Sequence, residues 1–317
     1  MWGHAGQLGS DMPVIRVNAG ANNRALDCHA TGGAQSQRLA QGQGPIVIMT
    51  HGYSFLPDDA RHCPHQHILA SKTQSSDPRA ISWPEAMGLT GTHANGTAIA
   101  FGWAARGSVW QAWHAAQTAG QEMAGLVRQI RAKFPARPIY LMGHSMGARV
   151  ICSALPHLKA GDVAGCILLA GATYRSHLAD SLNTPAGKTA WIVNVCSVQN
   201  RPFDLMLEAA TGAYGGMGQS IGRGARHPKA IDIQINDPKT HDAFARLGIP
   251  VARPKRGFCH WSVYSIPGIF ALYRRLIFGT LTVAQLHAVL QMHATPKIST
   301  HTIWRRLRPS ADAAGAV

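Results

Sequence analysis

Short apolar runs alternate with helix-spaced apolar positions along the central part of the chain. A compact run of roughly four to eight apolar residues is typical of a buried strand, and apolar residues three or four apart are typical of an amphipathic helix. The pattern predicts strands at 13–17, 45–50, 97–103, 139–142, 163–170, 191–195 and 231–235, and helices at 108–134, 146–157, 205–210, 267–278 and 283–293. Because strands and helices alternate, we expect a mostly parallel sheet that helices cover on both faces.

The 317 residues contain neither an internal repeat nor a Pro/Ser-rich linker. A chain of this length is compatible with one α/β domain. We expect a single domain over 1–317, with a core at about 45–280, an N-terminal extension at 1–44 and a C-terminal helix and tail at 281–317. Residues 54–96 are polar and irregular, and long loops of this kind are often functional, so we expect them to wall a substrate pocket.

One segment, RPIYLMGHSMGARVICSAL, joins an apolar strand to a helix through the turn GHSMG. This context is that of the G-x-S-x-G nucleophile elbow, with Ser145 at its tip. Gly143 and Gly147 fit because so sharp a turn brings strand and helix close together, where side chains would collide. The serine hydroxyl would then stand at a helix N-terminus, where free N–H groups face a developing negative charge.

A second match to the motif, GQSIG at 218–222, carries Ser220. It follows a glycine-rich run, with no apolar strand before it and no helical periodicity after it. A motif match is a hypothesis that its structural context must support, so we retain Ser145 as the nucleophile and reject Ser220.

A serine is a weak nucleophile at neutral pH and needs a base that a third group orients. The elbow predicts the chain order serine, acid, histidine. Of 17 histidines, His260 has the most suitable position, because it follows the last predicted strand and directly precedes a helix. His260 is therefore the predicted base.

The predicted acid is Asp204, which lies after the strand at 191–195 and beside the helix at 205–210. An alternative role for Asp204 is to cap that helix. Asn200 occupies a similar loop but carries no charge to stabilise an imidazolium. The other candidate acids are Asp180, Asp232 and Asp237.

The strand at 45–50 ends at His51-Gly52-Tyr53. A glycine directly after a buried strand permits a sharp turn that aims the next N–H inward. In the elbow scheme one oxyanion donor comes from such a loop, and the other comes from the residue after the nucleophile. We therefore predict that the N–H groups of Tyr53 and Met146 form the oxyanion hole.

The composition, 46% hydrophobic and 14% charged, is that of a folded globular protein. The formal charge is +15, but the basic residues are spread along the chain and no nucleic-acid motif accompanies them, so we expect a basic surface without a specific nucleic-acid partner. No apolar run approaches the roughly 18–20 residues of a transmembrane helix. The N-terminus lacks signal-peptide features and the six cysteines are unpaired in spacing, so we expect a reduced, cytoplasmic protein.

A histidine-rich patch comprises His62, Cys63, His65 and His67. Imidazole and thiolate groups at this spacing could hold zinc, but Pro64 interrupts the segment and a structural site would need a fourth ligand from elsewhere. We expect neither a metal nor an organic cofactor.

The HGY segment, the GHSMG elbow and the late His260 together resemble the α/β-hydrolase superfamily, within its serine esterase and lipase-like branch. The resemblance spans about 45–280 and implies an eight-stranded, mostly parallel sheet with the active site at the C-terminal ends of the strands. Such hydrolases often insert a cap domain, but the short gap between the strands at 163–170 and 191–195 leaves no room for a large one. Residues 54–96 or the loop at 212–224 would then cover the pocket.

The predicted function is hydrolysis of small-molecule carboxylic esters through Ser145, His260 and Asp204. The same site could serve a thioesterase, an amidase or an acyltransferase, because one triad supports all of these reactions. The alternative from another class is a non-catalytic protein of this fold that binds anionic partners through its basic surface, with tight and salt-sensitive binding as its signature.

Overall fold

A computed structural model describes residues 14–20, 39–40, 42–72, 80–91, 95–211, 218–255 and 257–292. Within these residues seven strands form one sheet in the order β1-β3-β2-β4-β5-β6-β7, and every neighbouring pair is parallel. The strands are β1 (Ile15–Asn18), β2 (Ile46–Thr50), β3 (Thr97–Gly102), β4 (Ile139–His144), β5 (Gly165–Leu169), β6 (Trp191–Cys196) and β7 (Ala230–Gln234). Each predicted strand is present, although the described residues hold seven strands and not the eight that the resemblance implied.

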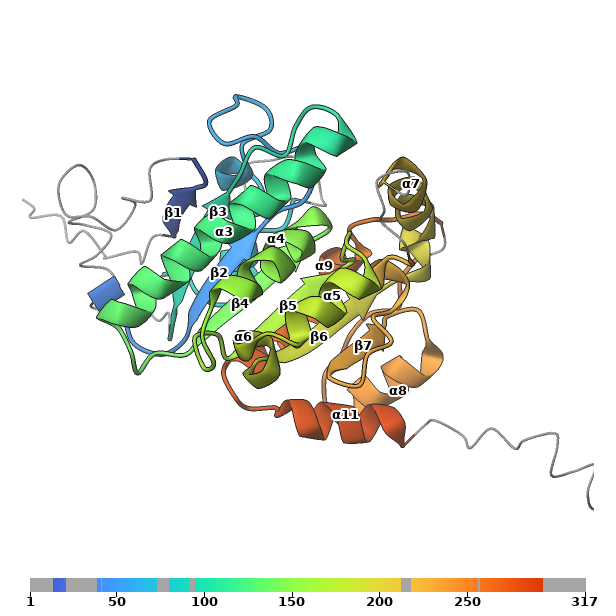
Figure 1. The fold of residues 1–317 in the computed structure, drawn as a ribbon. Helices are drawn as coiled ribbons and strands as arrows, with labels where there is room; N and C mark the ends of the chain where they lie inside the picture. The colour runs from blue at the N-terminus through green and yellow to red at the C-terminus, as the bar shows by residue number, and fades with distance from the viewer. Residues whose placement is uncertain are drawn as a thin grey trace, which may run out of the picture.

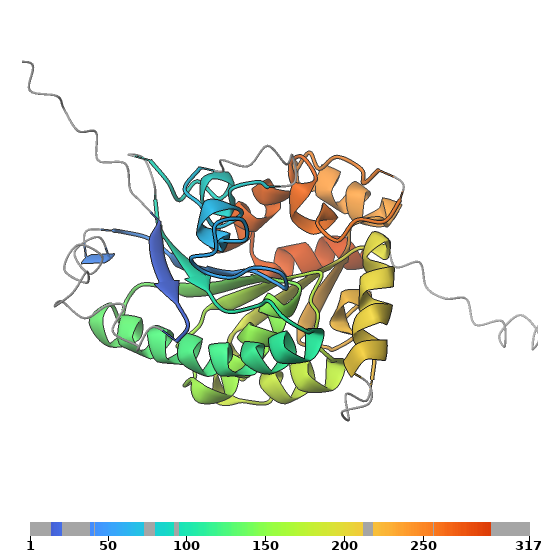
Figure 2. The same ribbon diagram turned by 90° about the horizontal axis from the view of Figure 1, so that it is seen from above.

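Helices cover both faces of the sheet, as Figures 1 and 2 show. One face carries α3 (Val109–Lys133), α4 (Met146–Ala154), α5 (Arg175–Leu182) and α6 (Pro185–Thr189). The other carries α2 (Trp83–Ala86), α8 (Pro238–Arg246), α9 (Ser262–Ser265), α10 (Ile269–Ile277) and α11 (Val283–Gln291). Helix α7 (Arg201–Thr211) stands at the side of the molecule, across the edge between the two layers (Figure 2).

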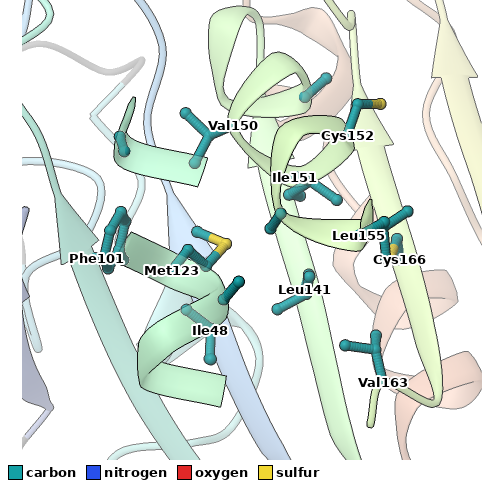
Figure 3. Close-up of a cluster of buried hydrophobic side chains, with 14 of the residues drawn as sticks. Ile48, Phe101, Met123, Leu141, Val150, Ile151, Cys152, Leu155, Val163 and Cys166 are labelled. Carbon is teal, nitrogen blue, oxygen red and sulfur yellow. The ribbon is translucent and has the colours of Figure 1, made fainter. Parts of the chain in front are cut away.

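The core lies in two layers because successive strand residues point to opposite faces of the sheet. In β2, Ile48 packs toward α3 and α4, whereas Met49 packs toward the C-terminal helices. Figure 3 shows the first layer, in which Met123 of α3 and Val150 of α4 lie over the strands. Each fully buried aliphatic side chain contributes about 1.5–3 kcal/mol to folding.

The longest helix, α3, begins and ends where its sequence signals predict. Ser108 is the N-cap and forms a capping box with Gln111, and Phe134 is the C-cap just before Pro135. The crossover between β5 and β6 contains only the short helices α5 and α6, which agrees with the prediction that no large cap is inserted there.

The short helices α2, α5, α6 and α9 were not predicted, and the structure also differs from the prediction after β6 and after β7. Helix α7 begins at Arg201 and not at residue 205, so Asp204 lies inside the helix and is not its N-cap. Helix α8 was not predicted, although Asp237 caps it and Pro238 occupies its first turn, both of which are helix-start signals. The predicted C-terminal tail and Cys28 lie outside the described residues. None of the helices that the structure describes is long and apolar enough to cross a membrane.

Candidate active site

Ser145 sits in the tight turn between β4 and α4. Its backbone adopts φ 53° and ψ −122°, a conformation that costs a non-glycine residue on the order of 1–3 kcal/mol. Three backbone hydrogen bonds hold it there: its N–H donates to Leu169 (2.9 Å), and its C=O accepts from Ala148 (3.0 Å) and Ala172 (2.9 Å). The surrounding fold therefore fixes the strained serine in the geometry expected of a nucleophile elbow.

The two glycines of the elbow are required by close approach. A Cβ at Gly143 would lie 2.7 Å from the carbonyl oxygen of Gly147, and a Cβ at Gly147 would lie 2.8 Å from that of His51. Real Cβ atoms essentially never approach other atoms so closely, so any side chain would push α4 away from the sheet. The predicted reason for both glycines agrees with the structure.

The second motif serine, Ser220, has a different environment. It is fully buried and caps the short 3₁₀ helix Ile221–Arg223, with its Oγ accepting from the Gly222 N–H at 3.1 Å. The same Oγ donates to Asp204 Oδ1 at 2.9 Å. Ser220 therefore supports Asp204 and does not occupy an elbow.

The loop after β2 passes directly beside Ser145. A Cβ at Gly52 would lie 2.6 Å from Ser145 Cβ and 3.2 Å from its Oγ, so only glycine fits. The next residue, Tyr53, lines the same cavity as Ser145, and its hydroxyl donates to the carbonyl oxygen of Gly107 at 2.6 Å. Met146 is the first residue of α4, so its N–H has no partner within the helix. Both predicted oxyanion donors therefore flank the serine.

His51 fixes the direction of one of these donors. Burial lowers the pKa of His51 to about 3, so the ring is neutral. Its Nε2 accepts from the Trp103 N–H (3.1 Å), which leaves the proton on Nδ1 to donate to the Gly52 carbonyl (2.9 Å). The Gly52 carbonyl and the Tyr53 N–H belong to one trans peptide and point in opposite directions, so this bond also orients the Tyr53 N–H.

If Tyr53 is an oxyanion donor as predicted, we expect Gly52→Ala to lower kcat/KM for a substrate that the wild type turns over by about 10²-fold, the usual cost of losing one such donor. The added methyl would displace the donor loop from the serine. The matched control is Gly102→Ala at the end of β3, where a Cβ would crowd Asn18 Oδ1 at 2.5 Å but would not approach Ser145. Ester kinetics and thermal unfolding of both variants check this: Gly102→Ala should lose stability but keep kcat. Equal losses of kcat in the two variants would contradict the role given to Gly52.

His260 lies in the loop before α9, and its ring is enclosed on several sides. Phe203 stacks on it with ring centroids 4.6 Å apart, and His144 lies 4.4 Å away on the same measure. Burial and the neighbouring His144 hold the pKa of His260 well below its usual range, so the ring is neutral. Its Nδ1 is hydrogen-bonded to Asn200 Oδ1. Because that oxygen can only accept, the proton is on Nδ1 and Nε2 is unprotonated.

His144, which precedes Ser145 in the elbow, was not identified from the sequence. Its Nε2 donates to the backbone carbonyl of His260 at 3.0 Å, and its ring packs edge-on against Tyr264 and Trp83. Burial lowers the pKa of His144 to about 4. His144 therefore ties the elbow to the loop that carries His260, and the only sequence signal was its position within the motif.

The acid predicted to contact His260 does not do so. Asn200 contacts the ring, and Asp204 lies one helical turn further along the chain, inside α7 and facing Ser220. The reason is local: the chain enters a short 3₁₀ helix (Val198–Asn200) directly after β6, which brings Asn200 to the position that the loop was expected to give Asp204. Burial raises the pKa of Asp204 to about 6, against the lowering effect of its hydrogen bonds with Ser220 and Asn200.

The other candidate acids are engaged elsewhere. Asp232 lies in β7 and accepts hydrogen bonds from Asn194 Nδ2 (2.7 Å) and the N–H groups of Ala225 and Arg226. Asp237 caps α8, and Asp180 lies on the exposed side of α5.

The predicted site residues share one cavity of about 980 Å³. Its lining includes Tyr53, Ser145, Met146, Asp204 and His260, together with Asn200. The remaining walls are largely apolar: Phe55, Val109, Phe203, Met206, Leu207 and Trp261. One wall therefore comes from the loop after β2, within the segment expected to form it, and another comes from α7. Residues 212–217, which were also expected to cover the pocket, lie outside the described residues.

The histidine-rich patch makes separate contacts. His62 Nδ1 bonds Asp59 Oδ1 (2.8 Å), and His65 Nε2 bonds Asn18 Oδ1 (2.6 Å). In the part of the chain that the structure describes, no three histidine, cysteine or acidic side chains gather in a group that could hold a metal ion.

The buried histidines predict how stability depends on pH. In the folded protein the pKa is about 3 for His51 and about 4 for His144, whereas both groups titrate near 6.5 when unfolded. Below pH 6.5 the unfolded chain therefore binds more protons, and stability falls as pH falls, by at most about 1.4 kcal/mol per pH unit for each histidine. Asp204, whose pKa is raised to about 6, partly opposes this trend. We expect the free energy of unfolding in urea to be at least about 2 kcal/mol lower at pH 5 than at pH 7, because His260, whose pKa is also held well below its usual range, adds to the same trend. Equal stability at the two pH values would contradict the burial of neutral imidazoles.

The parallel strand order and the strained serine after β4 define the α/β-hydrolase fold. The chain has the fold of the α/β-hydrolase superfamily and is similar over part of its length to one of its families. Residues 102–247 match the model of a family described as serine aminopeptidase, S33. This segment contains Ser145, Asn200 and Asp204, but neither the loop at Gly52 nor His260. The match and the fold together support a hydrolase.

Comparison with solved structures supports the fold alone. The chain is similar to the catalytic core domain of acetyl xylan esterase from Trichoderma reesei, at 12% identity over 78% of this chain and 98% of that one, with a TM-score of 0.36. It is also similar to TT1662 from Thermus thermophilus, at 13% identity over 79% and 91% of the two chains, with a TM-score of 0.40. Likenesses at this level carry no inference about substrate. The search of curated proteins gave no match.

Proposed function

We propose that the protein is a serine hydrolase that cleaves carboxylic esters of small molecules. The observation that carries the proposal is that a strained Ser145 and a neutral His260, fixed through Nδ1, line the same cavity. An unprotonated Nε2 is what a general base needs. Among the described residues no hydrogen bond joins Ser145 Oγ to His260 in this ligand-free site, and catalytic hydrogen bonds often form or tighten only when substrate binds.

The mechanism is two-step acyl transfer. His260 takes the proton from Ser145 as Oγ attacks the ester carbonyl, and the N–H groups of Tyr53 and Met146 stabilise the oxyanion by about 3 kcal/mol each. The imidazolium gives its proton to the leaving alcohol. Water then attacks the acyl-enzyme by the same route and releases the acid. Asn200 orients the ring throughout.

The cavity favours a neutral, apolar substrate. Its volume of about 980 Å³ is that of a small-molecule site, and aromatic and aliphatic side chains form most of its walls. An acyl or alcohol group of moderate size can bury its hydrocarbon there at about 0.8 kcal/mol per CH₂. We therefore expect kcat/KM to rise with acyl length from acetyl to medium-chain esters.

A panel of esters, thioesters and amides of graded acyl length tests the proposal. We expect the wild type to cleave esters fastest and Ser145→Ala to cleave them at least about 10⁴-fold more slowly. Absence of ester cleavage by the wild type, or equal rates in the variant, would refute the assignment. The same panel separates esterase from thioesterase and amidase chemistry, and added alcohols reveal acyl transfer.

A serine aminopeptidase is the second candidate, because the matched family carries that description. The free amine of an aminopeptidase substrate carries a positive charge, and a buried charge is normally paired with an opposite one such as a carboxylate. Among the described lining residues the one carboxyl group is that of Asp204, which Ser220 already engages, and Arg61 and several histidines line the cavity as well. We therefore expect aminoacyl anilides to be cleaved more slowly than neutral esters of equal size.

A further inference from the structure

The base is oriented by an amide, and an amide has two different ends. Asn200 is 1% exposed, and its Oδ1 faces His260 Nδ1. If the amide were turned over, its NH₂ group would face Nδ1 and the ring proton would be driven to Nε2. His260 could not then accept the proton of Ser145. Catalysis therefore depends on which end of Asn200 faces the ring.

A carboxylate lies at the other end of that amide. Both groups lie beside Gly222: a Cβ placed on this glycine would be 2.9 Å from Asn200 Nδ2 and 2.1 Å from Asp204 Oδ1. The amide nitrogen and the carboxylate oxygen are therefore close neighbours. The Asn200 side chain lowers the pKa of Asp204, as a donor to the carboxylate does. Asp204 is 2% exposed, and its Oδ2 is buried without a hydrogen-bond partner among the described residues.

Ser220 in turn presents a proton to Asp204, whose Oδ1 (2.9 Å) lies closer to the Ser220 hydroxyl than the other acceptor, the carbonyl oxygen of Gly171 (3.2 Å). Its Oγ accepts from the Gly222 N–H (3.1 Å), and Asp204 Oδ1 lies 2.9 Å away as the acceptor of its proton. An ionised carboxylate can only accept hydrogen bonds, so it favours the NH₂ end of Asn200. The serine of the second G-x-S-x-G segment thus supports the charge behind the amide.

We propose that Asp204 is a positioning residue that acts through Asn200: its carboxylate, held by Ser220, keeps the amide oxygen toward His260. This inference rests on the proposed role of His260 as the base. In a usual triad a carboxylate bonded directly to the histidine keeps the ring proton on Nδ1. Here the carboxylate of Asp204 has the same effect on His260 through the amide of Asn200.

The test compares Asp204→Asn, Ser220→Ala and the exchange variant that combines Asn200→Asp with Asp204→Asn. We expect Asp204→Asn to lower kcat by about 10²-fold with little change in KM, because an amide at 204 no longer selects one end of Asn200. Ser220→Ala should lose less, about tenfold. The exchange variant should recover most of the activity, because its carboxylate contacts His260 directly. Asp180→Asn, an exposed carboxylate on α5, is the matched control and should behave as the wild type.

A pH profile separates positioning from a purely structural role. The charged and titratable groups around Asp204 are Glu208 on the same helix, Arg223 on the 3₁₀ helix at 221–223 and the buried Cys196 on β6. Protonation of Asp204, with a pKa of about 6, would release the amide, so the wild type should lose kcat/KM below about that pH. This acid limb should be absent in Asp204→Asn, because the pKa of His260 beside Asn200 lies far lower. The exchange variant should show an acid limb of its own, because a carboxylate bonded directly to His260 raises the pKa of the ring.

The rate of covalent labelling by a fluorophosphonate provides a readout that needs no chosen ester. We expect labelling to slow in Asp204→Asn and to recover in the exchange variant. A labelling rate and kcat in Asp204→Asn within threefold of the wild type would overturn the inference while leaving the proposed function intact. So would an exchange variant no faster than Asp204→Asn. A wild type that the probe does not label would overturn both.

Discussion

Ser145→Ala is expected to lower kcat/KM for ester hydrolysis by about 10⁴–10⁶-fold, the range seen when a serine nucleophile is removed. The oxyanion donors and the cavity would persist, so substrate binding should change little. The substitution should change the free energy of unfolding little, because alanine at position 145 would keep the same positive φ and the same three backbone hydrogen bonds.

Kinetics of purified Ser145→Ala beside Ser220→Ala check this expectation, since the two serines occupy the same place in identical motif patterns. Ser220→Ala should keep measurable turnover, because Ser220 supports the site and does not attack the substrate. Similar residual rates in the two variants would contradict the choice of nucleophile.

His260→Gln is the second substitution with a large expected effect, a loss of about 10⁴-fold in kcat. Glutamine can still donate to Asn200 Oδ1 and fill the space beside Phe203, so the loop should keep its place. It cannot take the proton of Ser145. The residual rate should therefore rise with pH, as hydroxide replaces the missing base.

The matched control for His260 is His287→Gln on α11, where the ring is exposed and its Nε2 is hydrogen-bonded to Gln291 Nε2 at 2.7 Å. It should retain wild-type kcat. A loss below tenfold in His260→Gln, or no difference from His287→Gln, would show that another group serves as the base.

Much of the fold follows from local signals. Continuous apolar runs predicted the bounds of β2, β4 and β6 to within a few residues. Strands that are buried on both faces are apolar throughout, so each one stands out as a single apolar run. Apolar residues at helical spacing and the proline after Phe134 located α3, and the structure adds a capping box at Ser108. The elbow was found because strand, turn and helix agree with one another around Ser145.

The partner of His260 could not be predicted, because it depends on how the chain leaves β6. A 3₁₀ helix brings Asn200 to the ring, while the start of α7 at Arg201 turns Asp204 toward Ser220. Sequence reasoning favoured Asp204 by charge, whereas the backbone selects Asn200 by position. The contact between His144 and the carbonyl of His260 spans 116 residues, so no local pattern could reveal it.

The most direct test of the central proposal is to map the residue that a fluorophosphonate probe modifies. We expect mass spectrometry of digested wild type to find the adduct on Ser145 alone, and Ser145→Ala to carry none. Ser220→Ala should still be labelled on Ser145. An adduct on Ser220 or on any other residue, or labelling that persists in Ser145→Ala, would contradict the proposal that the elbow after β4 carries the nucleophile.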